Sequence, residues 1–567
     1  MAELAAEGLV GGFDRHWVAF LRWLEPGAPP EVIVAGTLAR AAIDRGHLCL
    51  DLGRPLLPPA LAARCGGLAA DCRPGLENSA LVSNGRGPAR TPLVLDRNRL
   101  YLFRYWQYET RLAEEILARA GAASEEQGEA GRAALAELTA AAGINLAPDQ
   151  ERAVLTALAR KLAVISGGPG TGKTTIVFFI LALLQKMAAK AGRPPLRIML
   201  LAPTGKAAAR LSQAVQGLEA MTIHRALGFQ SRTPTTFRHD RHNPLPVDLV
   251  VVDEASMVDV ALMSKLLAAV PEAARLVLLG DKDQLASVEA GSILGDICLA
   301  AAEPPLAACV IQLQQGFRFD AGHGIGALTR SINAGDADAV LALLAAGGRE
   351  ASISLAAPDD LLRDQGFREL VLAGFHDFLM AVSPAEALAR LGRFRLLCAH
   401  RRGWQGVAQL NRFCEQTLAA AGLLRPHGEW YQGRPLLITA NDYSLRLFNG
   451  DLGVIWEEPD GQLRACFLDD AGQFRTLAPG RLPAHETAFA MTIHKSQGSE
   501  FERVAVILPW EVSPVLTREL LYTAVSRARE EVRIFGREEV IRQAVATRVE
   551  RISGLADRLR PEPDGSR

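Results

Sequence analysis

A glycine-rich loop between a strand and a helix constrains this chain more than any other feature. Residues Gly167 to Thr174 (GGPGTGKT) fit the pattern G-x-x-x-x-G-K-[ST]. They follow an apolar run that ends at Ile165 and precede a helical stretch that starts near Thr174. The backbone N–H groups of such a loop and the helix N-terminus converge on phosphate oxygens. The sequence therefore predicts an α/β domain that binds a nucleoside triphosphate.

The side chains of this loop have separate chemical tasks. Lys173 adds a formal positive charge beside the β- and γ-phosphates, and the hydroxyl of Thr174 can ligate Mg²⁺. The complete set of expected nucleotide contacts in the loop is Gly167, Gly168, Pro169, Gly170, Thr171, Gly172, Lys173, Thr174 and Thr175.

Two later strands are expected to bring polar groups to the same phosphate site. Val250–Val252 is an apolar strand that ends in Asp253 and Glu254, at the edge where ligands of parallel sheets bind. We expect Asp253 to hold Mg²⁺ through water and Glu254 to orient the attacking water. Gln284 follows a third strand, and it is either a sensor of the γ-phosphate or an exposed turn residue.

Short β-branched runs alternate with helical stretches from about Gly143 onward, which predicts parallel sheets flanked by helices. The strand candidates are Leu162–Ile165, Ile198–Leu201, Leu249–Val252 and Leu276–Leu279, and a weaker second set is Phe394–Cys398 and Val504–Leu508. Between the members of the second set, Leu436–Leu482 contains hairpin turns at Asn449–Asp451, Pro459–Gly461 and Asp469–Gly472. A small all-β insertion in the second α/β unit is therefore expected.

The N-terminal block carries no phosphate or metal motif. Phe13, Trp17, Phe20, Leu21 and Leu24 recur at helical spacing, and the simplest interpretation is a stripe that faces a core. Ala120–Ala133 is polar and contains glycine, and it is interpreted as a linker between domains.

Charge and cysteine usage narrow the class of protein. Lys plus Arg total 62 and Asp plus Glu total 63, a net charge of −1, so a polyanion would have to be held in a local groove. The eight cysteines include no C-x-x-C pair, which favours reduced, buried thiols.

The longest apolar run, Ile176–Leu184, is about half of a bilayer span. A soluble, cytoplasmic protein without a membrane partner is expected.

Several further segments carry recognisable patterns in a fixed order. They are Leu201–Leu211 (LAPTGKAAARL), Thr222–Gly228 (TIHRALG), Val251–Asp259 (VVDEASMVD), Leu278–Cys298 (LLGDKDQLASVEAGSILGDIC), Gln314–Phe319 (QQGFRF), Leu447–Gly453 (LFNGDLG), Met491–Phe501 (MTIHKSQGSEF) and Leu521–Arg529 (LYTAVSRAR). Together with the phosphate loop they resemble the superfamily 1 helicases, and in particular the RecD family, over Gly143 to about Gly554.

The resemblance implies an α/β fold with two RecA-like P-loop motor domains that bind ATP and Mg²⁺ between them. By motif position, Gln150 corresponds to the glutamine that reads adenine, and Arg318 and Arg527 to arginines that reach the γ-phosphate from across the cleft. The implied catalytic set is Lys173, Glu254, Gln284, Arg318 and Arg527. The domains expected are a mainly helical N-terminal domain at 1–121, motor domain 1 at 143–335, motor domain 2 at 336–440 and 485–559, a small SH3-like β-barrel insertion at 441–484, and a disordered tail at 560–567.

The same resemblance implies 5′ to 3′ movement along single-stranded DNA and action at duplex ends. The candidate strand contacts are Pro203, Thr204, Lys206, His224, Thr492 and His494. Residues 229–246 include Arg238 and Arg241, and they form either a basic hairpin that separates strands or a solvated connector.

His47–Leu52 and Asn98–Glu109 also resemble the family, in which the N-terminal part docks onto RecB-like and RecC-like subunits as a heterotrimer. We therefore expect a helicase subunit of a complex that processes double-strand breaks for recombination, with the nuclease in a partner. A plain stabilising role is the alternative for the N-terminal domain. A stand-alone RecD-like helicase and an ATP-binding scaffold remain alternatives for the chain.

Overall fold

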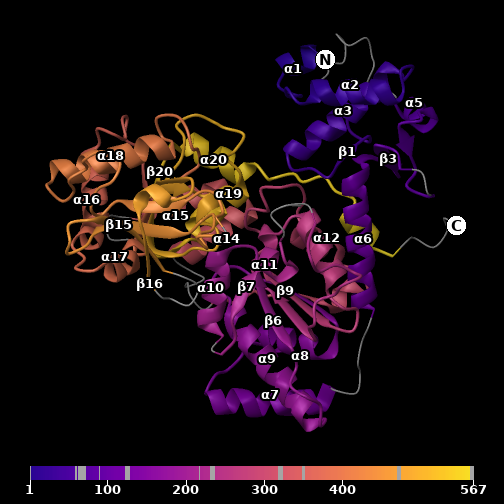
Figure 1. Ribbon diagram of the computed structural model, residues 1–567, viewed down its shortest axis with the longest axis horizontal. Helices are drawn as coiled ribbons and strands as arrows, with labels where there is room; N and C mark the ends of the chain where they lie inside the picture. The colour runs from indigo at the N-terminus through magenta and orange to yellow at the C-terminus, as the bar shows by residue number, and fades with distance from the viewer. Residues whose placement is uncertain are drawn as a thin grey trace.

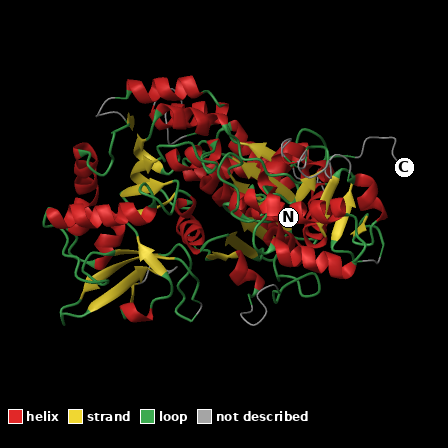
Figure 2. Ribbon diagram, turned by 90° about the horizontal axis from the view of Figure 1, so that it is seen from above, coloured by secondary structure: helices red, strands yellow, loops and turns green. Residues whose placement is uncertain are grey.

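The structure is a computed structural model of the 567-residue chain. It describes residues 2–55, 57, 61, 72–87, 90–121, 128–215, 217–229, 236–316, 324–347, 352–442, 444–468 and 474–561. Figure 1 shows the N-terminal block in indigo, a first α/β unit in magenta and a second α/β unit in orange to yellow. Seen from above, the strands lie in separate groups with helices around them (Figure 2).

The first α/β unit is built on a six-stranded parallel sheet. Its strand order is β10 (Val310–Gln312), β5 (Leu162–Ser166), β9 (Arg275–Gly280), β8 (Leu249–Val252), β6 (Ile198–Ala202) and β7 (Ala220–Thr222). Helices α7 (Gly128–Ala142), α8 (Pro148–Ala159), α9 (Lys173–Lys190) and α10 (Gly205–Ala214) cover one face. Helices α6 (Phe103–Ala120), α12 (Val260–Ala269) and α13 (Ile293–Ala300) cover the other. The four predicted strands are confirmed, because strands covered on both faces are continuous apolar runs.

The second α/β unit repeats this architecture with five parallel strands. The order is β11 (Ile353–Ala356), β20 (Ala528–Phe535), β19 (Phe501–Ile507), β12 (Phe394–Cys398) and β18 (Ala490–Thr492). Helices α14 (Gly324–Ala334), α15 (Ala337–Ala346), α19 (Arg518–Val525) and α20 (Glu538–Ala546) lie on one face. Helices α16 (Gln365–Leu379), α17 (Pro384–Leu391) and α18 (Val407–Ala420) lie on the other.

An antiparallel sheet is inserted between β12 and β18. Its order is β16 (Phe474–Leu477), β15 (Leu463–Leu468), β14 (Leu452–Glu457), β13 (Pro435–Ile438) and β17 (His485–Thr487), so it extends beyond 441–484 at both ends. The turns predicted at Asn449–Asp451 and Pro459–Gly461 lie between its strands, whereas Asp469–Gly472 falls outside the described residues. An all-β insertion is therefore present, and its likeness to an SH3 barrel stays a prediction.

The N-terminal block contains a sheet that the sequence did not suggest. Helices α1 (Ala2–Ala6), α2 (Asp14–Leu24), α3 (Pro30–Asp44) and α5 (Arg73–Asn78) accompany four strands in the order β1 (Cys49–Asp51), β4 (Arg99–Leu102), β3 (Leu93–Asp96) and β2 (Val82–Ser83). Such short strands have no room for a periodic pattern, which explains why sequence analysis missed them.

Helix α2 exists as predicted, but the core stripe assigned to it was largely wrong. Leu21 is fully buried, yet Phe13, Phe20 and Leu24 are exposed at 62%, 42% and 42%. The helix packs on the rest of the block through Val18 and Leu21, and the predicted Trp17 is partly buried against the same core. Phe20 and Trp23 form an aromatic face that lies in solvent.

The predicted linker at 120–133 was wrong from Gly128 onward, where α7 begins. Ala134 and Leu135 of α7 are buried against the first sheet, and their packing stabilises a helix that starts within the glycine-containing stretch. Residues 122–127 lie outside the described part of the chain.

The C-terminal segment leaves the second α/β unit and packs elsewhere. After α20 the chain crosses to α21 (Leu555–Leu559), whose Leu555 and Leu559 join the core between α6 and α13 (Figure 1). We call residues 547–559 the strap. It was assigned to motor domain 2 from the sequence, but its core contacts are with the first unit. The tail predicted at 560–567 is described only for its first two residues.

Candidate functional site

The phosphate loop lies at the carboxyl end of β5 and has the backbone that its glycines allow. Gly170 and Gly172 have φ angles of +77° and +81°, in the left-handed region that favours glycine. A Cβ atom on Gly172 would lie 2.4 Å from Nε2 of Gln150. Lys173 donates through Nζ to the carbonyl oxygens of Gly167 at 2.5 Å and Gly168 at 3.0 Å. The ammonium group of Lys173 therefore contacts the phosphate loop itself, next to the expected position of the phosphates.

Gln150 braces this loop from α8. Its side chain is buried, and Nε2 donates to the carbonyl oxygen of Thr171 at 2.9 Å while Oε1 accepts from the backbone of Ala147 at 3.0 Å. The predicted contact of Gln150 with adenine stays a prediction, but its position beside the loop is now explained by two hydrogen bonds.

Asp253 and Glu254 lie together at the carboxyl end of β8. Burial raises the pKa of Asp253 to about 6, and the charge of Glu254 adds to this effect. Oδ1 of Asp253 accepts from the backbone N–H of Glu254 at 2.9 Å. Glu254 itself has a φ angle of +52°, a strained conformation for a residue with a side chain. Such strain is typical of residues held in place for function.

A cavity of about 360 Å³ opens beside these acids at the junction of the two α/β units. Thr174, Asp253 and Glu254 of the first unit face Ser499, Glu500 and Arg529 of the second across it. The hydroxyl and carboxylate oxygens suit Mg²⁺, which takes its remaining ligands from water and phosphate. Within the described ranges, no group of three or more His, Cys, Asp and Glu could hold a metal alone.

Gln284 is buried beside the phosphate loop, so the exposed-turn alternative is wrong. Its Nε2 donates to Oδ2 of Asp281 at 3.0 Å, and the same oxygen accepts the hydroxyl of Tyr522 at 2.8 Å. A Cβ atom on Gly168 would lie 2.8 Å from that hydroxyl. Gln284 therefore lies where the first unit, the phosphate loop and the second unit meet.

Arg527 is 2% exposed and faces this junction from the second unit. It donates through Nη1 to the carbonyl oxygen of Ser499 and through Nε to that of Thr523, each at 3.2 Å. Burial lowers the pKa of Arg527, and the carboxylate of Glu254 opposes that shift. Arg318, the other predicted arginine, lies outside the described residues.

The predicted strand contacts have different local surroundings. Thr204 caps α10 by accepting from Ala207 at 3.2 Å, next to the half-buried Pro203. The ammonium of Lys206 lies 5.8 Å from the ring centroid of Phe501, and burial together with nearby arginines lowers its pKa to about 7. Lys206 lines the cavity that contains Asp253 rather than an outer groove.

The sequence Thr-Ile-His occurs at 222–224 and again at 492–494, and its two histidines differ in surroundings. His224, in α11 (Ile223–Leu227), packs its ring 5.8 Å from that of Phe237, and burial lowers its pKa. His494 is half-buried, and burial with the nearby Arg551 lowers its pKa. Thr492 is buried and accepts from the backbone of Lys495 at 3.3 Å.

The basic segment 229–246 is described only in part. Phe229 and Phe237 form an antiparallel bridge at its base, and residues 230–235 lie outside the described ranges. Arg238 follows this bridge, and Nη2 of Arg241 lies 3.9 Å from Glu115 of α6. The choice between a strand-separating hairpin and a connector stays open.

A second cavity, of about 940 Å³, separates the first unit from the inserted sheet, and sequence reasoning missed most of its residues. Aromatic and arginine side chains share its wall, namely Arg225, Phe229, Arg446, Phe448, Phe467 and Arg475. Phe448 belongs to the LFNGDLG segment, which was the available signal.

Comparison with known proteins finds family matches for three segments and relatives that span nearly the whole chain. Residues 6–101 match the model of the N-terminal domain of RecBCD enzyme subunit RecD, 150–290 match an AAA domain, and 487–535 match a UvrD-like helicase C-terminal domain. RecBCD enzyme subunit RecD of Mycolicibacterium smegmatis is 44% identical, with 95% of each chain covered. The same subunit of Mycobacterium tuberculosis is 41% identical over 97% of this chain and 95% of that protein.

Two further matches are more distant. The ATP-dependent RecD2 DNA helicase of Deinococcus radiodurans is 34% identical over 73% of this chain and 52% of that protein. A Pif1 helicase structure from Candida albicans aligns with 71% of this chain and 97% of its own at 16% identity and a TM-score of 0.43.

Two parallel sheets, a phosphate loop with its acidic pair and an arginine across the junction define the motor of an ATP-dependent DNA helicase. Within that class, the chain belongs to the family of RecBCD enzyme subunit RecD. None of the helices in the described ranges is long and apolar enough to cross a bilayer.

Proposed function

We propose that this chain is the 5′ to 3′ helicase and translocase subunit of a RecBCD-type helicase and nuclease that acts in double-strand break repair and homologous recombination. The observation that carries the proposal is the cavity at the junction of the two α/β units, where Thr174 and Glu254 of the first unit face Ser499 of the second. Ser499 accepts from Arg527, whose charge is also close enough to be attracted by Glu254. ATP bound there would draw the two units together, and its hydrolysis would release them. Strand cleavage is assigned to a partner.

The chain's own residues supply the hydrolytic chemistry. Lys173 and Arg527 bring positive charge to the terminal phosphates from opposite sides, and Glu254 positions the attacking water. Thr174 and Asp253 would hold Mg²⁺, which neutralises phosphate charge when bound. Gln284 donates to Asp281, which also accepts from Tyr522 beside the phosphate loop, and this position suits it to sense the γ-phosphate.

The larger cavity supports a path for single-stranded DNA beside the inserted sheet, which we propose to be SH3-like. Arg225, Arg446 and Arg475 would pair with backbone phosphates, while the half-buried Phe448 offers a surface for base stacking. This combination binds strands without sequence preference, as a translocase requires. Pro203, Thr204, His224, Thr492 and His494 remain proposed contacts along the motor domains.

The aromatic face of α2 supports partner docking by the N-terminal domain. Phe20 and Trp23 stack at 6.3 Å, and Trp23 is 75% exposed. Contiguous apolar surface of this kind marks interaction sites. We assign it to RecB-like or RecC-like subunits, in the cytoplasm where chromosomal DNA is repaired.

Unwinding of duplexes with a 5′ or a 3′ overhang tests the function, with the chain alone and with its partners. We expect unwinding from the 5′ overhang and DNA-stimulated ATP hydrolysis, both abolished by Lys173→Gln. Equal background rates for the wild type and Lys173→Gln would leave only the scaffold alternative. A native mass that stays monomeric when partners are added would favour the stand-alone helicase.

A further inference from the structure

Three arginines hold one short loop of the second unit at the motor junction. The loop is residues 498–500, which lie in the connection from η5 (His494–Ser496) to β19. Arg210 donates to the carbonyl oxygen of Gly498 at 3.1 Å and to Oε1 of Glu500 at 2.9 Å. Arg529 pairs with Oε2 of Glu500 at 3.0 Å, and Arg527 donates to the carbonyl oxygen of Ser499. The loop is therefore fixed residue by residue.

Arg210 is the member of this set that comes from the other motor domain. It lies on α10 of the first unit, whereas Arg527 and Arg529 follow α19 of the second. Its hydrogen bonds to Gly498 and Glu500 thus cross the junction. If the two units move apart, either these hydrogen bonds break or the loop at 498–500 moves with Arg210.

Arg210 also faces the acids of the first unit. It lines the 360 Å³ cavity with Asp253 and Glu254. Burial works against its charge, but the carboxylates of Glu500, Glu254 and Asp253 together raise the pKa of Arg210. The guanidinium of Arg210 is therefore attracted by acids of both units. Its five N–H groups are enough to donate hydrogen bonds to both sides.

We propose that Arg210 is a positioning residue that couples the hydrolytic carboxylates Asp253 and Glu254 to the loop that holds Arg527. The inference rests on the proposed ATP-driven function and extends it to a residue outside the expected catalytic set. A divalent cation held by Thr174 and Asp253 would offset part of the negative charge of the two acids. The attraction of Arg210 then shifts toward Glu500, which tightens the loop and sets Arg527 against the phosphate.

The competing explanation is that the contact between Arg210 and Glu500 only holds the two units together, as a structural latch. Exchanging the charges of the two residues distinguishes these explanations. Arg210→Glu is combined with Glu500→Arg and with Arg529→Glu, because Arg529 also pairs with Glu500, so that the exchanged pair across the junction can re-form without two arginines in contact. The exchange also puts a carboxylate beside Asp253 and Glu254, where coupling requires a cation. If Arg210 is only a structural latch, the exchanged variant should recover both the unfolding midpoint and kcat. If Arg210 couples the acids to the loop, the exchanged variant should recover the unfolding midpoint alone.

The experiment measures kcat and KM for ATP with saturating single-stranded DNA, together with the thermal unfolding midpoint, in the full chain. We expect Arg210→Ala and Glu500→Gln each to lower kcat by about tenfold or more, with KM changed by less than about threefold, because the contact acts on the transition state. The exchanged pair should recover the unfolding midpoint but not kcat. Arg197→Ala, which removes an exposed Arg–Asp pair at 2.7 Å within the first unit, is the control and should match the wild type.

Wild-type kcat in Arg210→Ala, or recovery of kcat in the exchanged pair, would overturn the inference. Glu500→Gln keeps the test decisive if Arg210→Ala does not fold, because it removes the same pair from the second unit. Lys173→Gln is measured in parallel. If it leaves hydrolysis unchanged, the proposed function fails, and if it abolishes hydrolysis while Arg210→Ala does not alter kcat, only the inference fails.

Discussion

Gly46 leaves the space that Arg551 occupies: a Cβ atom on Gly46 would lie 1.3 Å from Nη1 of the arginine. Arg551 belongs to the strap and donates to the carbonyl oxygens of Ser287 at 3.1 Å and Glu289 at 3.4 Å. The neighbouring Ile552 donates to Nδ1 of His47 at 3.0 Å. The strap therefore contacts both the N-terminal block and the first motor unit. Arg551 can lie between them because Gly46 has no side chain.

Gly46→Ala should destabilise the chain by about 3 kcal/mol, since it adds a left-handed backbone penalty and displaces charge-assisted hydrogen bonds of Arg551. Gly46 has a φ angle of +86°. Gly8→Ala is the matched control, because Gly8 has a φ angle of +67° with nothing within 4 Å of its Cβ position. We expect about 1 kcal/mol for Gly8→Ala by urea unfolding. Equal losses in the two variants would contradict the role assigned to Arg551.

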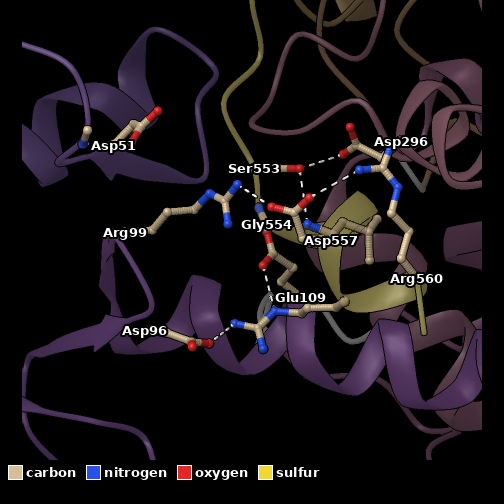
Figure 3. Close-up of polar contacts among 12 residues, drawn as sticks. Asp51, Asp96, Arg99, Glu109, Asp296, Ser553, Gly554, Asp557 and Arg560 are labelled. Atoms are coloured by element: carbon tan, nitrogen blue, oxygen red, sulfur yellow. Dashed lines mark hydrogen bonds and ion pairs between the residues drawn. The ribbon is translucent and has the colours of Figure 1, made fainter. Parts of the chain in front are cut away.

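Glu109→Gln should weaken the docking of the strap. The buried Glu109 accepts from the backbone of Gly554 at 2.9 Å, and both residues are labelled in Figure 3. Glu109 also accepts from the hydroxyl of Tyr101 at 3.0 Å and from Nε of Arg558 at 2.8 Å. Removing one charge of a buried pair costs about 3–5 kcal/mol. Limited proteolysis should then cleave the strap sooner. Glu77→Gln, in an exposed pair with Arg73, should cost less than about 1 kcal/mol.

Asp296→Asn should stabilise the protein at high pH only. Burial raises the pKa of Asp296 to about 7, although Ser553 donates to it at 2.7 Å (Figure 3). The folded chain thus keeps a proton that the unfolded chain releases, so stability is lost as pH rises from about 4 to about 7. Asparagine does not titrate, so the variant avoids this loss of unfolding free energy, which reaches about 4 kcal/mol.

Unfolding of wild type and Asp296→Asn at several pH values checks this. We expect no gain near pH 4 and the full gain near pH 8. A gain of the same size at every pH would show that Asp296 does not titrate as described.

Phe448→Ala and Arg225→Ala should weaken single-stranded DNA binding in different ways. Loss of a stacking ring costs about 1–3 kcal/mol without changing the salt dependence, whereas loss of a phosphate contact lowers the slope of log K against log salt by about 0.7. Fluorescence anisotropy at several salt concentrations measures both. Arg363→Ala, at an 87% exposed side chain, is the control. Unchanged affinity in both variants would exclude the 940 Å³ cavity as the strand path.

The sequence by itself determined the phosphate loop, the acidic pair and the strands that carry them. Each is a contiguous segment whose backbone needs are met locally, such as the left-handed Gly172 before α9 or the apolar run before Asp253. Buried strands of a parallel sheet leave a clear apolar signature, so the central strands β5, β6, β8 and β9 of the first sheet and β12 and β19 of the second were predictable from the chain, whereas the remaining strands of both sheets were not predicted.

Only the tertiary structure decided which distant residues meet. The strands of the N-terminal sheet are too short for a pattern, and the exposure of Phe13 and Phe20 depends on what packs against α2. The contact of Arg210 with Glu500 and that of Gly46 with Arg551 join residues hundreds of positions apart. Such contacts arise from the docking of whole units, whose energy is spread over many side chains and leaves no local trace in the sequence.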